Sequence, residues 1–568
     1  MDKNDFRKGV LIMHQLIEQW KAAPLPIYLS EELKESEEVQ LEDCFYKSLQ
    51  FGTGGIRGEI GVGTNRMNIF TIRHAAYGLA KHVASNGEYA KQQGVVIAYD
   101  TRHFSKEFAV ETARVLGAHG VKAYVFSEQR PTPELSFAVR YLKAFAGVVI
   151  TASHNPKQYN GFKVYDSDGA QMVPKDVQVI IDAMASVKDL FSIEVADFEL
   201  HGKWILEEID NAYAAKLNQL KMREIDSELK LVYTPLHGAG LVPVTRGLKE
   251  MGFTNVHVVE AQAKPDGDFS TVPYPNPEES AAFQMAIQLG KEVGADLLLA
   301  TDPDADRLGV AVRRDHEYVL LTGNQLGALI IEYLLSEKRE AGTLPENGVV
   351  IKTIVTSELG ASIARLYGVE VVNVLTGFKY IAEKIAEYEE TGEKQFLFGY
   401  EESYGYLVEP FVRDKDAVQL ALVTAEMASF YAKQGKTLLD ALDSLFVLYG
   451  YYKEKLISKA FVGKSGQEEM QKLLESYRSN PLTEIGGLKV SCVEDYLNGI
   501  ATYSDGTTST INLPQENVLK YILQDGSWVA IRPSGTEPKC KFYIGTSSQN
   551  EDEANTKMNT LYSYFKNI

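Results

Sequence analysis

The 568-residue sequence predicts an α/β fold with several domains, and three observations support this prediction. First, the chain is too long for one hydrophobic core, and its length corresponds to about three to five domains. Second, short apolar runs alternate with helical segments, a pattern typical of sheets with parallel strands. Third, 45% of the residues are hydrophobic and 24% are charged, an ordinary composition for a globular protein.

The first α/β unit is indicated by three buried strand candidates. They are residues 95–99, 123–126 and 147–150, and residues 105–118 between the first two have a helical pattern. An amphipathic helix is expected ahead of this unit, over residues 6–21, because apolar residues recur there at helical spacing.

The same layout recurs twice further along, without a repeat in the sequence itself. The strand candidates of the second and third units are residues 229–233, 256–259, 296–300, 349–354, 371–375 and 396–398. In the tail, residues 486–547 contain several strand-like runs and residues 551–566 form a closing helix, which predicts a smaller α+β domain. Residues 264–279 contain four prolines and are expected to form a long loop.

Charge and cysteine content exclude several classes of protein. A net charge of −19 argues against nucleic-acid binding, and it means that any phosphate site needs locally concentrated cations. Three cysteines at this spacing fit neither a zinc site nor a disulfide framework, so isolated reduced thiols are expected. The sequence has no signal peptide and no apolar stretch of about 18 to 20 residues, so we expect a cytoplasmic protein that does not enter membranes.

Polar residues directly follow the strand candidate 147–150, where ligands of open α/β sheets bind. The segment Thr151-Ala152-Ser153-His154-Asn155-Pro156 predicts a turn, because a residue before proline is disfavoured in helices. The turn would expose Ser153 beside His154, with Lys163 ten residues on, and phosphoryl transfer to serine needs such a base and cation. An ordinary helix-capping turn is an equally good interpretation of this segment alone.

Three carboxylates follow the strand candidate 296–300. Asp302, Asp304 and Asp306 alternate along the chain, and in an extended loop they would point to one side, as a hard cation requires. The segment is not an EF-hand, because arginines stand where that loop needs its glycine and its final glutamate. A Mg²⁺ site is therefore favoured over a solvated acidic loop.

Two polar segments follow strand candidates of the third unit. They are Thr376-Gly377-Phe378-Lys379 and Gly399-Tyr400-Glu401-Glu402-Ser403. Adjacent carboxylates and a serine between aromatic residues can bind sugar hydroxyls and cover a sugar face. They could instead bind metal or cap a helix.

Two more segments are suited to phosphate. In the tail, Arg532-Pro533-Ser534-Gly535-Thr536-Glu537-Pro538-Lys539 concentrates hydrogen-bond donors, which favours a phosphate-binding turn over a plain proline-bounded turn. Near the N-terminus, Gly52-Thr53-Gly54-Gly55-Ile56-Arg57-Gly58 fails as a dinucleotide-binding motif, because Arg57 replaces the third glycine and no clear strand precedes it. A glycine-rich loop that presents Arg57 to phosphate is the better interpretation.

Five of these segments together are far more specific than any one of them. They are Gly-Thr-Gly-Gly-Ile-Arg-Gly, Thr-Ala-Ser-His-Asn-Pro, Asp-Pro-Asp-Ala-Asp-Arg, Gly-Tyr-Glu-Glu-Ser and Arg-Pro-Ser-Gly-Thr-Glu-Pro. The sequence resembles the α-D-phosphohexomutase superfamily in all five, in that family's order. The resemblance implies an α/β fold of three related domains with mixed or parallel sheets, plus a C-terminal α+β domain, around a central cleft. The expected domains are residues 1–208, 209–322, 323–452 and 453–568.

The resemblance also implies roles for individual residues. Ser153 would carry the phosphoryl group, and Mg²⁺ would be bound by Ser153, Asp302, Asp304 and Asp306. Proton and phosphoryl transfer would be assisted by Arg57, His154, Lys163 and Lys379. Substrate would be bound by Arg307, Thr376, Gly377, Glu401, Ser403, Arg532, Ser534, Gly535 and Thr536.

The sugar loop resembles one branch of the superfamily. With Asp414-Lys415-Asp416 downstream, it is similar to the branch of Gram-positive-type α-phosphoglucomutases and phosphopentomutases. Tyr404-Gly405-Tyr406 stands where many bacterial phosphomannomutase/phosphoglucomutases have a histidine, which makes Lys379 the stronger acid/base candidate in this domain. The resemblance therefore implies interconversion of α-D-glucose 1-phosphate and glucose 6-phosphate, with glucose 1,6-bisphosphate as intermediate and activator.

Other functions remain as alternatives. Mannose or pentose phosphates are possible substrates, and no oligomeric state follows from the sequence. A phosphatase would not need the Arg532 turn for a second phosphate. A non-catalytic sugar-phosphate sensor would not need to retain Ser153 and the three aspartates.

Overall fold

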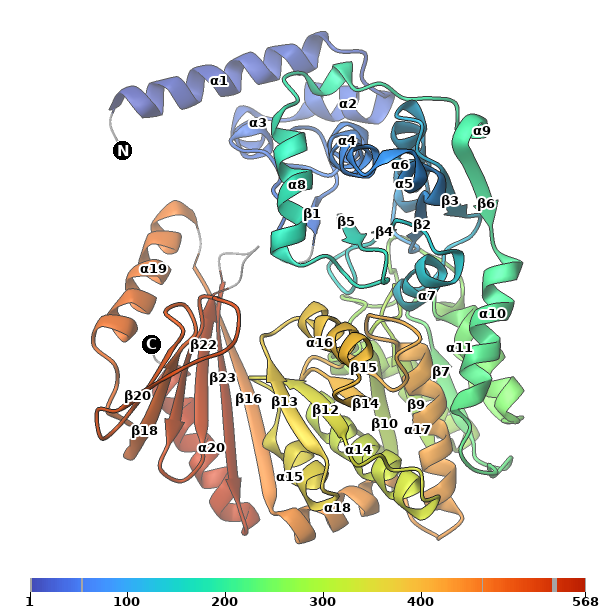
Figure 1. Cartoon of the computed structure of the whole chain (residues 1–568), viewed down its shortest axis with the longest axis vertical. Coiled ribbons are helices and arrows are strands. Elements are labelled where there is room, and N and C mark those ends of the chain that lie inside the picture. Colours follow the sequence, from blue (N-terminus) through green and yellow to red (C-terminus); the bar gives the residue numbers. More distant parts are fainter. Residues whose placement is uncertain (1–2, 53–54, 462, 534–538, 567–568) are drawn as a thin grey trace. The chain divides into compact units, whose positions relative to one another are not determined.

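The computed structural model describes residues 3–52, 55–461, 463–533 and 539–566. Figure 1 labels the helices and strands along the chain. The chain divides into two compact units. The first unit is Met1–Leu320 with Ala382–Ala386 and Gly405–Ser429, and the second is Leu321–Ile381 with Glu387–Tyr404 and Phe430–Ile568. The chain therefore leaves the first unit after Leu320 and later returns to it twice.

The first unit contains a six-stranded mixed sheet in the order β1-β5-β4-β2-β3-β6. The strands β4, β2, β3 and β6 are parallel, whereas β5 is antiparallel to both β4 and β1. The strands are β1 (Ile56–Glu59), β2 (Val95–Tyr99), β3 (Ala123–Phe126), β4 (Ala146–Ile150), β5 (Tyr159–Tyr165) and β6 (Gly202–Ile205). The helices of this part are α1 (Lys3–Ala22), α2 (Ile27–Glu35), α3 (Glu38–Phe45), α4 (Ile69–Ser85), α5 (Gly87–Gln93), α6 (Ser105–Ala118), α7 (Thr132–Leu142), α8 (Pro174–Ala185) and α9 (Phe198–His201).

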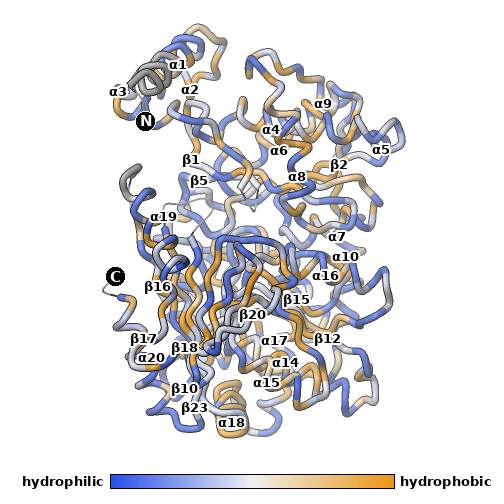
Figure 2. The backbone as a smooth tube through the Cα atoms, turned by 60° about the vertical axis from the view of Figure 1, so that its left-hand side comes forward, coloured by the Kyte–Doolittle hydropathy of each residue, from blue (hydrophilic) through white to orange (hydrophobic). Residues whose placement is uncertain are grey.

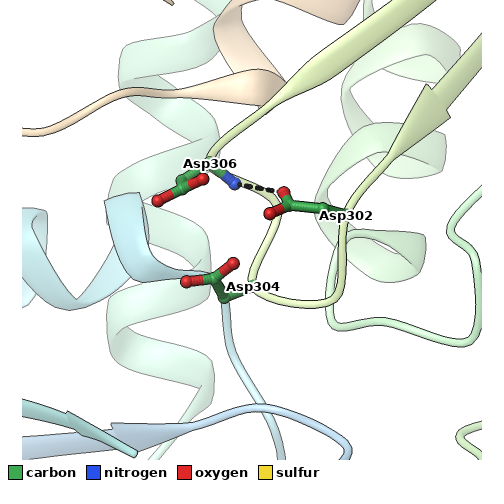
Figure 3. Close-up of side chains that lie close together, drawn as sticks. All are labelled: Asp302, Asp304 and Asp306. Atoms are coloured by element: carbon green, nitrogen blue, oxygen red, sulfur yellow. Dashed lines mark hydrogen bonds between the residues drawn. The ribbon is translucent and has the colours of Figure 1, made fainter. Parts of the chain in front are cut away.

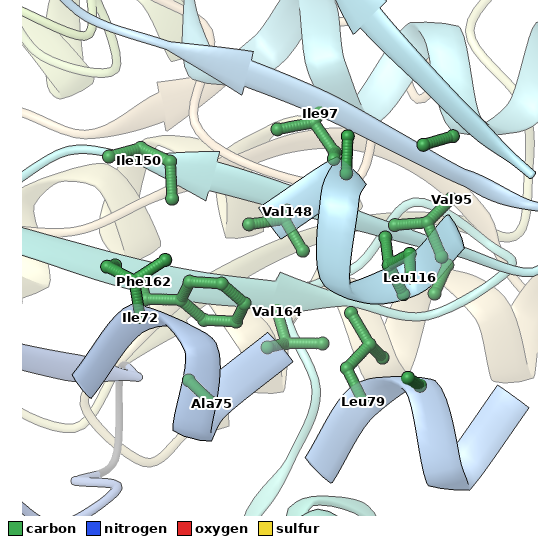
Figure 4. Packing of buried hydrophobic residues seen from close by; sticks show 14 of the residues in the cluster. Ile72, Ala75, Leu79, Val95, Ile97, Leu116, Val148, Ile150, Phe162 and Val164 are labelled. Carbon is green, nitrogen blue, oxygen red and sulfur yellow. The ribbon is translucent and has the colours of Figure 1, made fainter. Parts of the chain in front are cut away.

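Local signals and the core explain this arrangement. Helix α4 begins at a capping box, in which Asn68 Oδ1 accepts the Thr71 N–H and Thr71 Oγ1 accepts the Asn68 N–H. Figure 4 shows Leu79 of α4 and Leu116 of α6 packed with Val148 of β4 and other strand residues. Every residue of β2 and β4 is buried, as expected for central parallel strands. This close packing fixes the carboxyl ends of β2 and β4, where the site begins.

The first unit also contains a five-stranded sheet in the order β11-β10-β9-β7-β8. Strand β7 is parallel to β8 and β9, and β10 is antiparallel to β9 and β11. The strands are β7 (Leu231–Thr234), β8 (Val256–Val258), β9 (Leu297–Thr301), β10 (Leu308–Arg314) and β11 (Glu317–Leu320). The helices are α10 (Glu207–Leu217), α11 (Leu241–Met251), α12 (Glu260–Ala263) and α13 (Gln284–Val293), and the returning chain adds β15 (Tyr406–Leu407) and most of α17 (Ala417–Ala432).

The second unit contains a parallel sheet segment and a C-terminal antiparallel sheet. Strand β12 (Gly348–Thr353) lies between β13 (Glu370–Val374) and β14 (Gln395–Tyr400) and is parallel to both. The C-terminal sheet has the order β16-β23-β22-β21-β18-β19-β20, and Figure 2 shows hydrophobic stretches along it. Its strands are β16 (Tyr451–Ala460), β17 (Glu484–Ile485), β18 (Leu488–Asp495), β19 (Ile500–Tyr503), β20 (Thr508–Thr510), β21 (Leu519–Leu523), β22 (Trp528–Pro533) and β23 (Lys539–Ser548). The helices of the second unit are α14 (Gly323–Glu340), α15 (Glu358–Leu366), most of α16 (Phe378–Thr391), α18 (Leu438–Tyr449), α19 (Gly463–Ser479) and α20 (Glu551–Lys566).

The predicted α/β class is confirmed, and α6 and α20 have the predicted bounds. The loop interpretation of the Arg57 segment is wrong, because Ile56–Glu59 forms strand β1 and pairs with β5 about a hundred residues later. The three cysteines are free, as expected, and all three are buried. Within the described ranges, every helix is too short or too polar to traverse a lipid bilayer.

Candidate active site

The predicted nucleophile, Ser153, lies in the loop that follows β4. Its backbone has a φ of +51°, a left-handed conformation that costs a non-glycine residue about 1 to 2 kcal/mol. The Ser153 N–H donates a 2.8 Å hydrogen bond to Thr151 Oγ1, and that hydroxyl donates a 2.6 Å hydrogen bond to Asp100 Oδ2. The expectation of an exposed turn is wrong, because Ser153 is 3% exposed.

The Ser153 hydroxyl has two polar neighbours. It donates a 2.7 Å hydrogen bond to Asp302 Oδ2, and His154 Nδ1 lies 3.1 Å from the same oxygen. Burial, together with the nearby Arg307 and Arg57 guanidinium groups, lowers the pKa of His154 well below its usual value. This environment favours the neutral form of the His154 imidazole.

The three aspartates of the predicted metal site are brought together by a tight turn. Figure 3 shows the carboxylates of Asp302, Asp304 and Asp306 facing a common space, and one oxygen from each lies within 4.8 Å of the others. Ala305 has a φ of +48°, so the expectation of an extended loop is wrong, although the predicted convergence is correct. Asp302 Oδ1 stabilises the turn by accepting the N–H groups of Asp306 (3.1 Å) and Arg307 (3.0 Å).

Two lysines balance the charge of this cluster. Lys163 Nζ lies 3.0 Å from Asp304 Oδ2 and 3.5 Å from Asp306 Oδ2, and Lys415 Nζ lies 3.1 Å from Asp306 Oδ2. Burial raises the pKa of Asp302 well above its usual value, and the neighbouring Asp306 and Asp304 raise it further. Burial also opposes ionisation of Asp306, but Lys415 and Lys163 outweigh it and lower the pKa of that carboxyl.

The aspartate cluster fits a hard divalent cation. Asp304 Oδ1 and Asp306 Oδ1 are buried and accept no hydrogen bond from any residue in the described part of the chain. Buried carboxylate oxygens without a donor are costly unless a cation satisfies them. Oxygen ligands are those that Mg²⁺ prefers, so this donor set is suited to that ion.

Two predicted arginines lie around the same loops. Arg57 donates a 3.2 Å hydrogen bond through Nη1 to Asn155 Oδ1, two residues beyond the nucleophile. Arg307 donates through Nη1 to Glu278 Oε1 at 2.5 Å, and its Nε lies 3.8 Å from Asp306 Oδ1. Lys163 contacts Asp304 and Asp306 directly, so its observed position balances the charge of the aspartate cluster.

In the second unit, the sugar-loop candidates contact one another. Glu401 Oε1 accepts the Gly377 N–H at 2.9 Å, and both Glu401 and Lys379 are buried. The Thr376 hydroxyl is buried and has no hydrogen-bond partner among the described residues. Ser403 is half-buried in the same loop. The two segments that follow β13 and β14 thus form one polar cluster.

Arg532 lies at the end of β22 in the same unit. Its Nε and Nη2 donate hydrogen bonds of 3.1 and 3.0 Å to Glu516 Oε1. Burial opposes the charge of Arg532, but Glu516, with a further contribution from Glu402 of the sugar loop, raises its pKa. Arg532 is therefore within electrostatic reach of the sugar loop. Ser534, Gly535 and Thr536, the other predicted phosphate ligands, lie outside the described residues.

Comparison with known families identifies the chain. The α/β/α domains I, II and III and the C-terminal domain of the phosphoglucomutase/phosphomannomutase family match residues 48–190, 211–315, 322–449 and 478–558. The chain belongs to this family. It is an isomerase that acts as an intramolecular phosphotransferase, and the proteins it resembles in sequence are named accordingly.

A phosphoglucomutase of Staphylococcus aureus (strain MSSA476) is 40% identical over 533 residues, covering 93% of this chain and 95% of that relative. A phosphoglucomutase of Staphylococcus haemolyticus (strain JCSC1435) is 41% identical over 532 residues, covering 92% of this chain and 94% of the relative.

Solved structures of phosphoglucomutase/phosphomannomutase family members share the fold. The crystal structure of a protein of Thermus thermophilus, described there as a phosphomannomutase, has a TM-score of 0.67 at 23% identity, covering 92% of this chain and 99% of that one. A family protein of Burkholderia thailandensis has a TM-score of 0.66 at 21% identity, covering 91% of this chain and 97% of that one.

Three residues of this candidate site were not predicted from the sequence. Arg102 binds the nucleophile loop, Thr132 binds Asp304, and Lys415 binds Asp306. Arg102 follows β2 just as Ser153 follows β4, so the rule that places sites at the carboxyl ends of strands could have found it. No comparable sequence pattern marks Thr132 or Lys415. Thr132 begins helix α7, Lys415 lies in the segment that returns to the first unit, and both are far along the chain from the aspartates that they contact.

Proposed function

We propose that this chain is a phosphoglucomutase that interconverts α-D-glucose 1-phosphate and glucose 6-phosphate through a phosphoserine enzyme. The observation that carries the proposal is the buried Ser153 hydroxyl, which lies 2.7 Å from an aspartate of a metal-binding cluster. The names of the relatives at about 40% identity favour glucose phosphate over mannose or pentose phosphate.

The metal site is proposed to hold Mg²⁺ through Asp302, Asp304 and Asp306, with Ser153 or its phosphate as a further ligand. The two carboxylate oxygens that accept no hydrogen bond among the described residues support this assignment. When bound, the ion would neutralise charge on the transferring phosphoryl group. Lys163 and Lys415 hold the second oxygens of Asp304 and Asp306 and so limit the net negative charge of the cluster.

The reaction moves one phosphoryl group and one proton at each transfer. In the first transfer, the Ser153 Oγ–P bond breaks, a sugar hydroxyl oxygen bonds to phosphorus, and that hydroxyl loses its proton. Glucose 1,6-bisphosphate results, and its other phosphate then returns to Ser153 with breakage of that sugar O–P bond. His154 is proposed to accept the Ser153 proton on this return and to supply one when Ser153 leaves, since its Nδ1 lies 3.1 Å from Ser153 Oγ.

The second unit is proposed to recognise the sugar phosphate. Glu401, Ser403, Thr376 and Gly377 would bind sugar hydroxyls, and Lys379 would assist proton transfer at the sugar. Arg532, with Ser534, Gly535 and Thr536, would hold the phosphate that does not react. Arg57 and Arg307 would stabilise the phosphoryl group near Ser153. Electrostatic coupling between Arg532 and Glu402 supports the placement of phosphate and sugar sites beside each other in this unit.

A substrate comparison tests the proposal. The purified protein is given glucose, mannose and ribose 1-phosphates in separate coupled assays with Mg²⁺ and the matching bisphosphate. The highest kcat/KM is expected with glucose 1-phosphate. A higher value with either of the other sugars would assign the chain to phosphomannomutase or phosphopentomutase activity, and no turnover with any of them would refute the mutase proposal.

A further inference from the structure

The guanidinium of Arg102 is buried beneath the loop that carries Ser153. Its Nη2 donates hydrogen bonds to the carbonyl oxygens of Ser153 (2.6 Å) and Asn155 (2.5 Å). Its Nη1 donates to the carbonyl oxygens of Pro156 (2.8 Å) and Tyr159 (3.1 Å). One side chain thus binds four carbonyls of a seven-residue segment, and it is 3% exposed.

These four hydrogen bonds hold a backbone that is not stable by itself. Residues 153–158 are neither helix nor strand, and Tyr159 begins β5. Ser153 has a left-handed φ that disfavours every residue with a Cβ. Such a conformation persists only where the surroundings determine it. A planar guanidinium can bind several carbonyls in fixed directions, which a lysine ammonium cannot do.

The other side of the Ser153 residue is bound from the same segment of chain. Asp100 Oδ2 accepts the Thr151 hydroxyl, which in turn accepts the Ser153 N–H. Asp100 Oδ1 accepts the Arg102 N–H at 2.9 Å. Both the N–H and the carbonyl of Ser153 are therefore tied to residues at the carboxyl end of β2, the central strand next to β4.

A loop from another part of the first unit covers the guanidinium. The Phe269 ring lies over Arg102, with 4.9 Å between Arg102 Cζ and the ring centroid, and Phe269 is buried. Phe269 belongs to the proline-rich segment 264–279, which thus contributes to the site without reaching the reacting atoms. The Asp100 carboxylate compensates the charge of Arg102, and its Oδ2 lies 3.4 Å from Arg102 Nε.

From this geometry we infer that Arg102 is a positioning residue, which fixes Ser153 Oγ against Asp302 and His154 so that the serine can receive and donate phosphate. The inference rests on the proposed phosphoserine function. Arg102 touches no reacting atom, so its loss should slow phosphoryl transfer without weakening substrate binding. Misplacement of a reacting group by about 1 Å costs on the order of a hundredfold in rate.

The test uses Arg102→Lys, which retains the charge but not the planar fork. The rate at which glucose 1,6-bisphosphate phosphorylates the dephosphorylated full-length protein is followed by intact mass, and kcat and KM are measured separately. We expect phosphorylation and kcat to fall about a hundredfold, while KM for glucose 1-phosphate changes by less than about threefold. Arg114→Lys is the matched control, because Arg114 also binds a backbone carbonyl, that of Ala196, away from the site, and should leave both rates unchanged.

The outcomes separate the two proposals. If wild-type protein is not phosphorylated, the proposed function fails. If wild-type protein is phosphorylated and folded Arg102→Lys is phosphorylated at the same rate, or if its KM rises as much as its kcat falls, the positioning role is overturned. Should Arg102→Lys not fold, Phe269→Leu keeps all four hydrogen bonds and removes only the covering ring. It is expected to lower kcat about tenfold at constant KM, and an unchanged kcat would overturn the inference.

Discussion

Thr132 and Asp304 are joined by two hydrogen bonds of 2.9 Å. The Thr132 hydroxyl donates to Asp304 Oδ2, and the Thr132 N–H donates to the Asp304 backbone carbonyl. Thr132 is the first residue of α7, which packs on the six-stranded sheet, whereas Asp304 follows β9 of the five-stranded sheet. Thr132 thereby fixes a carboxylate of the aspartate cluster from a distant part of the same unit. Groups that orient metal ligands in this way typically account for about tenfold to a hundredfold in metal affinity.

Thr132→Val is expected to raise the Mg²⁺ concentration needed for half-maximal activity about tenfold, because Asp304 loses a hydrogen bond that orients it. Activity is titrated with Mg²⁺ at saturating substrate. Thr112→Val serves as control, since the Thr112 hydroxyl bonds to the Phe108 carbonyl of its own helix. An unchanged Mg²⁺ requirement in Thr132→Val would show that the hydroxyl does not support the metal site.

Ser153→Ala is expected to fold normally and lose nearly all mutase activity. The hydroxyl is the proposed phosphoryl carrier, and alanine can adopt the same backbone at similar cost. Circular dichroism and steady-state rates are compared with those of Ser186→Ala, at an exposed helix end. Turnover of Ser153→Ala at the rate of that control would transfer the role of carrier to another residue.

Arg532→Ala is expected to raise KM in both reaction directions by about tenfold to a hundredfold, the value of one charge-assisted hydrogen bond. It should also make the enzyme more dependent on added glucose 1,6-bisphosphate, because the intermediate would escape more often. Arg478→Ala is the control, since Arg478 forms a similar pair with Asp495 in the same domain. A change in one direction only would mean that Arg532 does not bind the phosphate of both substrates.

Lys520 makes stability depend on pH. Burial, with the like charge of Lys352 nearby, lowers its pKa from 10.5 to about 8, although Glu494 and Glu358 partly oppose this. Between these two values the unfolded chain binds more protons than the folded one, so the free energy of unfolding rises with pH. At lower pH the full cost of burying the charge is present, even though the ammonium donates to the Ile354 carbonyl at 2.8 Å.

Wild-type protein is therefore expected to gain about 2 kcal/mol of stability relative to Lys520→Met between about pH 8 and pH 10. Denaturant unfolding at several pH values measures both proteins, which cancels contributions from other groups. Lys489→Met, at an exposed position of β18, should show no such divergence from the wild type. A constant difference between wild type and Lys520→Met would rule out this titration.

The site residues that could be predicted from sequence are those that directly follow a recognisable strand in the same stretch of chain. Ser153 and the three aspartates each follow an apolar strand run, so their place at a sheet edge was correctly predicted. The reason given for the convergence of the aspartates was incorrect, because a left-handed Ala305 cannot be recognised from alternate spacing. The buried state of Ser153 was also missed, since it depends on Asp302 from another sheet.

The remaining site features depend on pairing between distant segments. Arg57 lies on a strand because β1 pairs with β5, and no sequence pattern near Arg57 indicates that partner. Lys415 approaches Asp306 because the chain returns to the first unit after Tyr404. Local patterns predict the elements themselves, whereas register and return paths are set by tertiary packing.

The returning segment has a consequence for how the molecule unfolds. Within the first unit, Asp416 at the start of α17 accepts the Tyr213 hydroxyl, and the Ala417 N–H donates to the Ala305 carbonyl. The unit is thus completed by residues that follow much of the second unit in the chain. A fragment ending at Leu320 would lack them, so the first unit should not melt as an autonomous block. On heating, unfolding of the first unit is expected to be coupled to unfolding of the second. Loss of the returning segment is expected to disorder the aspartate turn early in this transition.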